Sequence, residues 1–115
     1  MYAARMNALR LSIIVPAYNE ERTIGQIMDR LHAACPFAEL IFVDDGSNDR
    51  TLEILKQKAG PNDLVLTKPN GGKGSAVRMG YAHAHGNYTI VQDANGRVTV
   101  AAPGAEQSAS ISVTR

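Results

Sequence analysis

The 115-residue sequence contains a single cysteine, no tryptophan and few other aromatic residues, and its charges nearly cancel. Because Cys35 is alone, neither an internal disulfide nor a cysteine-based zinc site can form, which is typical of a protein from a reducing compartment. A net charge of +1 provides no basic surface, and the scattered aromatic residues provide no stacking platform. We therefore expect no nucleic-acid partner.

Long apolar runs are also absent, and no stretch of the sequence is long enough to span a bilayer. The opening segment carries two arginines, but Ser12 and Pro16 interrupt the apolar run that follows. We therefore do not expect a signal peptide. What is present is ordinary for a folded domain, with 44% hydrophobic and 20% charged residues. A chain of this length predicts one small domain.

Short apolar runs alternate with segments of helical periodicity. The predicted strands are Leu11–Ala17, Glu39–Val43, Leu64–Thr67 and Tyr88–Gln92. The predicted helices lie between Asn19 and Pro36, from about Asp49 to Lys58, and around Val77–Ala84. Asn19 is expected to cap the first helix, and Ser47 or Asn48 the second. This alternation with short connections predicts an α/β fold, an open, doubly wound, mainly parallel sheet with right-handed crossovers. The strand order we expect is 3-2-1-4.

The composition changes at Asn95. Residues 95–115 are rich in Ala, Ser, Thr, Val and Gly, and few of them are charged. The segments RVTVA and SISVT alternate weakly and can pair as a hairpin, while a disordered or foreign tail is an equally good interpretation. We therefore predict an N-terminal extension over 1–10, an α/β domain over 11–94 and an atypical tail over 95–115.

Polar segments follow the carboxyl ends of the predicted strands, where open α/β sheets bind their ligands. If the strand order is 3-2-1-4, the crevice lies between the first and fourth strands. The loops that reach it are Pro16–Glu20, Asp44–Asn48, Asn70–Gly74 and the segment from Asp93 onward. We expect the functional site to be built from these loops.

Asp44 and Asp45 come directly after the second predicted strand. Carboxylates at this position can accept hydrogen bonds from the N–H groups of a base and from ribose hydroxyls. Asp, Gly, Ser and Asn are also turn formers, so DDGSND can equally be a turn and a helix cap without a ligand. This segment alone does not decide between the two interpretations.

The NGGKGSA segment combines glycines, backbone N–H groups, Lys73 and a predicted helix start, a combination that suits a pyrophosphate. It has neither the spacing of a P-loop nor the third glycine of the dinucleotide fingerprint. A plain flexible loop is the alternative interpretation.

Asp93 ends the fourth apolar run, where a carboxylate is costly unless it meets a cation or hydrogen-bond donors. A Mg²⁺ or Mn²⁺ ion that bridges two phosphates would supply the cation. The alternative is a carboxylate that caps the next turn. The three histidines show no metal-ligand spacing shared with acids, so we interpret them as surface or packing residues.

Taken together, these segments resemble the family 2 glycosyltransferases of the GT-A fold, especially the branch of dolichyl- or undecaprenyl-phosphate sugar synthases. The matching text is SIIVPAYNEERTI, then ELIFVDDGSNDRT, then KPNGGKGSAVRMGYAHAHGNYTIVQDA. It covers about Leu11 to Ala94. Each motif is weak evidence alone, but the ordered set is specific to the family.

The resemblance implies a set of site residues, a cofactor and a reaction. The nucleotide-sugar contacts it implies are Pro16, Ala17, Tyr18, Glu20, Asp44, Asp45, Gly72, Lys73 and Gly74. Asp93 would be the catalytic residue and a ligand of Mg²⁺ or Mn²⁺, with Asn95 as a second ligand. The donor would be a UDP- or GDP-hexose, and the hexose would pass, with inversion, to an acceptor such as polyprenyl phosphate. The expected location is cytoplasmic, peripheral to the inner membrane face.

The sequence departs from the family at the metal motif, which reads Asp93-Ala94-Asn95 where the family has a second acid. Asn95 can offer a carbonyl oxygen to a metal but no negative charge. The residues after it resemble nothing in the family, which indicates the truncated or out-of-frame end of a longer enzyme. A catalytically inactive fragment that binds nucleotide-sugar is therefore the alternative function.

Two further expectations concern other classes and partners. A nucleotidyltransferase ranks behind because that class places a glycine-rich, basic loop after the first strand, where this chain has PAYNEER. A fourth strand left at the edge of the sheet would favour a homodimer through edge pairing.

Overall fold

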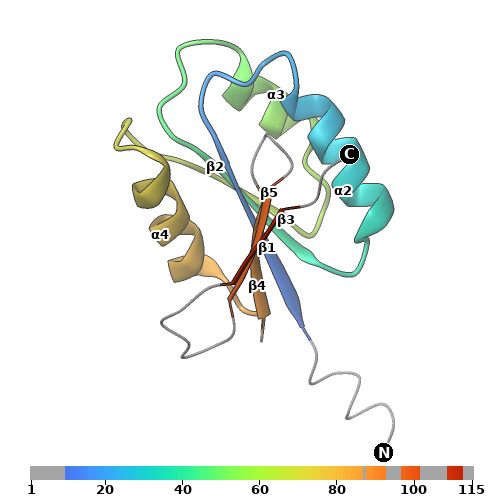
Figure 1. Ribbon diagram of the computed structural model, residues 1–115. Helices are drawn as coiled ribbons and strands as arrows, with labels where there is room; N and C mark the ends of the chain where they lie inside the picture. The colour runs from blue at the N-terminus through green and yellow to red at the C-terminus, as the bar shows by residue number, and fades with distance from the viewer. Residues whose placement is uncertain (1–9, 87, 93–96, 102–108, 113–115) are drawn as a thin grey trace, which may run out of the picture.

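The computed structural model describes residues 10–86, 88–92, 97–101 and 109–112. Within these residues, six strands form one sheet in the order β3-β2-β1-β4-β5-β6 (Figure 1). The strands are β1 (Leu11–Ala17), β2 (Glu39–Asp44), β3 (Asp63–Thr67), β4 (Tyr88–Gln92), β5 (Arg97–Ala101) and β6 (Ala109–Ser112). The strands β1 to β4 run parallel. The predicted order 3-2-1-4 is confirmed.

In the part of the chain that the structure describes, three helices cover the two faces of the sheet: α2 (Ile24–Ala34), α3 (Thr51–Lys58) and α4 (Lys73–His83). In Figure 1, α2 and α3 lie together on one side of the strands and α4 lies on the other. Successive side chains of a strand point to opposite faces, so each central strand supplies both layers of the core. The sheet is therefore doubly wound, as the alternation of apolar runs and helical segments predicts.

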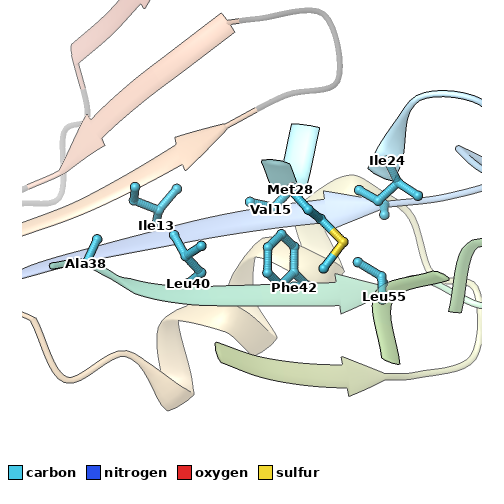
Figure 2. Close-up of a cluster of buried hydrophobic side chains, with 9 residues drawn as sticks. Ile13, Val15, Ile24, Met28, Ala38, Leu40, Phe42 and Leu55 are labelled. Carbon is cyan, nitrogen blue, oxygen red and sulfur yellow. The ribbon is translucent and has the colours of Figure 1, made fainter. Parts of the chain in front are cut away.

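The two layers of the core follow the alternation along β1 and β2. On the α2–α3 side, Val15 and Phe42 pack with Met28 and their neighbours (Figure 2). On the α4 side, Ile14 and Ile41 belong to the second cluster, with Val43, Ala76 and Val91. Because both faces of β1 and β2 are buried, these strands read as continuous apolar runs rather than alternating ones. The core therefore anchors β1 and β2, and the end of β2 carries Asp44 with Asp45 directly after it.

Gly80 is where α4 approaches β1 most closely. A Cβ added there would lie 2.5 Å from Ile14 Cγ2. We expect Gly80→Ala to lower the free energy of unfolding by about 1–3 kcal/mol, the usual cost of overpacking a core. The matched control is Gly25→Ala in α2, where the added Cβ would meet Lys58 Cδ at an ordinary 3.5 Å. Chemical denaturation measures both; a Gly80 variant as stable as the Gly25 variant would contradict this packing.

Both predicted helix caps are wrong. The bounds of α2 leave Asn19 outside the helix, and α3 begins at Thr51. The side chain that serves the start of α3 belongs to Asp49, whose Oδ1 accepts a hydrogen bond from Thr51 N–H at 2.9 Å. Ser47 and Asn48 hydrogen-bond to the loop after β1 instead. Tertiary partners decide which polar residue caps a helix, and single-segment patterns do not contain them.

The edge of β4 is covered. β5 pairs with β4 and β6 pairs with β5, both antiparallel. The predicted hairpin of the tail is thus confirmed, and it extends the sheet beyond β4. The fourth strand is not an exposed edge as expected, because β5 occupies the hydrogen-bonding groups that a second copy would need there. A homodimer through a strand edge stays a prediction. Among the described residues, no helix has the length and apolar character needed to cross a bilayer.

Candidate functional site

The loops after β1 and β2 lie against each other at the carboxyl edge of the sheet. Asn19 has a positive φ of 51°. Its N–H donates to Ser47 Oγ at 2.9 Å, and its side-chain oxygen accepts from Asn48 N–H at 2.8 Å. Glu20 N–H donates to Thr51 Oγ1 at 2.8 Å. These bonds hold the first two predicted site loops together as one unit.

Asp45 is the centre of a hydrogen-bonded cluster and is only 3% exposed. Its Oδ1 accepts from Lys68 Nζ at 2.8 Å and from Gly71 N–H at 3.0 Å, and its Oδ2 accepts from Gly72 N–H at 2.9 Å. Asn70 Nδ2 donates to the Asp45 carbonyl at 3.1 Å. The carboxylate therefore joins the end of β2 to the glycine-rich loop before α4.

Asp44 and Asp45 point to opposite faces of the sheet, because successive side chains alternate along a strand. Asp44 lies on the face of Phe42, toward α2 and α3, and Asp45 lies on the face of Val43, toward α4. Asp44 is 2% exposed, and its Oδ2 accepts from Thr67 Oγ1 at 3.2 Å. Its Oδ1 is buried and has no hydrogen-bond partner among the residues that the structure describes. A buried carboxylate oxygen without a donor is costly. The two acids, which the sequence treats as a pair, thus have different surroundings.

The other predicted contacts of the first loop differ in exposure. Pro16 and Glu20 are half-buried, Ala17 is buried, and Tyr18 is 44% exposed. Asp45 N–H donates to the Ala17 carbonyl at 2.9 Å, which ties this loop to the acidic segment. The Tyr18 ring is thus the large side chain of this group that a ligand can reach.

The predicted diphosphate contacts divide into two sets. The Gly71 and Gly72 amides donate to Asp45. Lys73 and Gly74 lie in the first turn of α4 and are exposed. Gly72, the N-cap of α4, has a φ of 93°, a conformation that side chains with a Cβ rarely adopt. The backbone conformation at position 72 therefore favours glycine.

The predicted metal ligands Asp93 and Asn95 lie outside the described residues. Among the residues that are described, no three His, Cys, Asp or Glu side chains gather as a metal site would require. The described part of the chain therefore does not by itself form a metal site.

Two carboxyl groups at the site are held in the ionised form. Burial by itself raises the pKa of Asp45, but the hydrogen bonds from Lys68, Gly71 and Gly72 outweigh it, so the pKa lies below the usual 3.8. For Asp49, burial also raises the pKa, and hydrogen bonds led by those from Thr51 bring it below 3.8. Both side chains therefore act as acceptors at neutral pH.

Acid should unfold the protein through these carboxylates. A lowered pKa in the folded state contributes stability that is complete above the unfolded pKa and is lost as the pH falls through the folded one. We expect the free energy of unfolding to be nearly constant from about pH 7 to pH 5 and to fall below about pH 4. Denaturation of Asp49→Asn should show a smaller fall, while Glu53→Gln, which changes a solvent-exposed ion pair, should match wild type. Equal pH dependence in Asp49→Asn and wild type would contradict this.

Sequence reasoning missed Lys68. Its side chain is 16% exposed, and the side chain of its partner Asp45 is 4% exposed. Lys68 N–H also donates to the Asp44 carbonyl at 3.0 Å. The available signal was a lysine placed directly after the third predicted strand, at the same sheet edge as the acidic segment.

A separate cavity of about 310 Å³ lies at the opposite, amino edge of β2 and β3. Its lining includes Cys35, Lys58 and the pair His32–Asp63, whose Nε2–Oδ2 distance is 2.6 Å. Gly60 N–H donates to the same Asp63 oxygen at 2.8 Å. This pair ties α2 to the turn before β3, which agrees with a packing role for His32.

The fold and the arrangement of its loops define a glycosyltransferase domain of the GT-A fold. The chain belongs to glycosyl transferase family 2, whose family model matches residues 12–99. The match continues past Asn95 into β5. This corrects the expectation that nothing after Asn95 resembles the family, and the family assignment removes the nucleotidyltransferase alternative.

Named relatives agree with this assignment. The chain is 38% identical over 94 residues to an undecaprenyl-phosphate 4-deoxy-4-formamido-L-arabinose transferase of Pectobacterium atrosepticum, an alignment that covers 74% of this chain and 28% of the relative. The chain thus spans less than a third of the length of the curated relatives it matches.

Solved structures show the same fold. Glucosyl-3-phosphoglycerate synthase from Mycobacterium tuberculosis, in complex with Mn²⁺, UDP and glucosyl-3-phosphoglycerate, is similar with a TM-score of 0.67 and 26% identity, over 80% of this chain and 36% of that one. S. aureus TarS has a TM-score of 0.65 and 30% identity, over 75% of this chain and 27% of its own.

Proposed function

We propose that this chain forms the nucleotide-sugar-binding part of a glycosyltransferase that transfers a hexose from a UDP- or GDP-sugar. The observation that carries the proposal is the acidic pair at the carboxyl edge of the sheet. Asp45 is kept ionised, and Asp44 has a buried oxygen without a donor among the described residues. Such acceptors suit the N–H groups of a base and the hydroxyls of a ribose.

The remaining contacts follow from the loops around this pair. Pro16, Ala17 and Tyr18 would line the base and ribose pocket, with Glu20 at its margin. Lys73 and the amides in the first turn of α4 would lie along the diphosphate, where positive charge and the helix dipole favour an anion. In this arrangement the protein holds the nucleotide and orients the sugar toward the open edge of the sheet.

A divalent metal belongs to the proposal. The similar synthase structure contains Mn²⁺ together with UDP. Here Asp93 and Asn95 would hold Mg²⁺ or Mn²⁺, and a bound ion would neutralise the charge that develops on the departing diphosphate. Asp93 is the residue we propose as catalytic, since it would touch the ion beside the reacting phosphate.

The acceptor we propose is a lipid phosphate such as polyprenyl phosphate, and the transfer would proceed with inversion. Curated relatives are named for undecaprenyl phosphate. A phosphate acceptor is already anionic near neutral pH and needs little help from a general base. We place the chain at the cytoplasmic face of the membrane, where such an acceptor would be met peripherally.

A second candidate function is favoured by Asn95, which stands where the family has a second acid. The chain would then bind nucleotide-sugar without turnover. The test is to incubate the 115-residue chain with Mn²⁺, UDP-glucose or GDP-mannose, and polyprenyl phosphate, and to follow binding and sugar transfer separately. Transfer supports the enzyme and rejects the inactive fragment, whereas binding alone supports the fragment. The absence of nucleotide binding would overturn both.

A further inference from the structure

The glycine-rich loop before α4 is fastened to the end of β2 by several independent contacts. The Asp45 carboxylate accepts hydrogen bonds from the Gly71 and Gly72 amides and from the Lys68 ammonium. The Asn70 side chain donates to the Asp45 carbonyl. The approach is close, because a Cβ on Gly46 would lie 2.5 Å from Asn70 N. The loop is therefore held against the end of β2.

Two of the loop's amides are already used. A carboxylate offers about four acceptor positions, and Asp45 accepts three hydrogen bonds from Lys68, Gly71 and Gly72. A diphosphate that took the Gly71 and Gly72 amides would have to leave a buried carboxylate short of donors, which is costly. The free first-turn amides expected at a helix start lie one step further along, at Gly74 and Ser75.

Lys68 is the charged member of this arrangement. Its ammonium lies 2.8 Å from Asp45 Oδ1 and 2.6 Å from the Pro69 carbonyl. A Cβ on Gly71 would approach the Lys68 nitrogen to 2.8 Å, so the ammonium lies directly under the loop. The other charged residues of the surrounding elements are Glu39 and Asp44 on β2, Asp63 on β3, and Lys73 and Arg78 on α4. Arg78 is the one that reaches the loop, since a Cβ on Gly74 would lie 3.4 Å from Arg78 Nη1. Lys68 thus supports both the carboxylate and the loop that covers it.

We propose that Lys68 is a positioning residue: with the Gly71 and Gly72 amides it orients the Asp45 carboxylate for the nucleoside, so this cluster serves nucleoside recognition and not the diphosphate. This inference rests on the proposed nucleotide-sugar function. It assigns a role to a lysine that has none in the sequence motifs, and it gives the Gly71 and Gly72 amides an acceptor within the protein, the Asp45 carboxylate.

The test compares a nucleoside diphosphate with its parent nucleoside. Lys68→Met keeps the aliphatic stem and removes the charge. We expect it to weaken UDP and uridine (or GDP and guanosine) by the same factor, about tenfold. Gly72→Ala, which strains a backbone with φ of 93° but meets no atom within 4 Å, should also weaken both equally. Lys58→Met, a lysine in the more exposed pair with Asp29, is the matched control and should change neither.

Two results would overturn the inference. One is a Lys68 variant that loses affinity for the diphosphate while its affinity for the nucleoside is unchanged. The other is a Lys68 variant that binds both ligands as the Lys58 variant does. Either result would show that Lys68 does not support nucleoside binding through Asp45.

A second readout needs no nucleotide. The Asp45 carboxyl signal in NMR should titrate below pH 3.8 in wild type and at higher pH in Lys68→Met, with the Gly71 and Gly72 amide signals moving along with it. An unchanged titration would overturn the positioning role. A wild type that binds neither UDP nor GDP would overturn the proposed function, and the role of Lys68 toward Asp45 is then decided by this titration.

Discussion

Asp45→Ala should lose nucleotide binding by about a hundredfold or more. The substitution removes a charged acceptor, worth about 1.5–3 kcal/mol to a bound donor, and it frees the loop that the carboxylate holds through the Gly71 and Gly72 amides. It also leaves Lys68, only 16% exposed, without its partner. We therefore expect the free energy of unfolding to fall by about 3 kcal/mol, the lower end for a broken buried pair. Isothermal titration and chemical denaturation measure the two effects.

The control for Asp45 is Asp29→Ala. Asp29 makes an ion pair of similar length, 2.9 Å, with Lys58, but its side chain is 65% exposed. Exposed pairs contribute about 0–1 kcal/mol, so this variant should match wild type in stability and in nucleotide affinity. An Asp45 variant that binds nucleotide as well as the Asp29 variant would mean that the DDGS segment is a turn only.

Asp44→Leu should change stability and binding in opposite directions. Leu has the same branching as Asp, with two bulkier methyl groups in place of the carboxylate oxygens, and it removes the buried Oδ1 that lacks a donor among the described residues. We expect the free energy of unfolding to rise by about 1–3 kcal/mol, the cost that an unsatisfied buried polar group imposes. Nucleotide affinity should fall about tenfold or more, because a ligand donor would lose its acceptor.

The Asp44 result has a clear contrary outcome. Thr67, which is exposed, can replace its bond to Asp44 with water, so loss of that bond is not expected to destabilise the variant. A destabilised Asp44→Leu protein would show that the carboxylate is satisfied within the fold. Unchanged nucleotide affinity would remove Asp44 from the site. Together, the two variants distinguish Asp45, which we expect to stabilise the fold, from Asp44, whose burial we expect to destabilise it.

The strands could be predicted because their signal is local. Runs such as LSIIVPA and ELIFV are apolar on both faces, which requires helices on both sides of a parallel sheet. The alternation predicts a parallel, doubly wound sheet, and 3-2-1-4 is one of the common orders of such a sheet. The caps could not be predicted in this way, because Asn19 and Asn48 find their partners across two loops and not in their own helices.

The site shows the same division between local and tertiary signals. The acidic segment and the glycine-rich loop are visible as motifs, but the hydrogen bonds between them join residues 25 to 27 positions apart. Lys68 begins the third matching segment but has no role in the motif, and its contact with Asp45 becomes visible only when the ends of β2 and β3 lie side by side. The different surroundings of Asp44 and Asp45 follow from strand alternation, once the end of β2 is known.

Nucleotide-sugar binding at this edge of the sheet can be tested by titrating the chain with UDP-glucose and with GDP-mannose in the presence of Mg²⁺, which is diamagnetic, and following backbone amide signals. We expect saturable binding of one of them, with the largest changes at Tyr18, Asp45 and Lys73, and little change at His32 beside the opposite cavity. Changes centred on His32, or no saturable binding of either nucleotide-sugar, would contradict it.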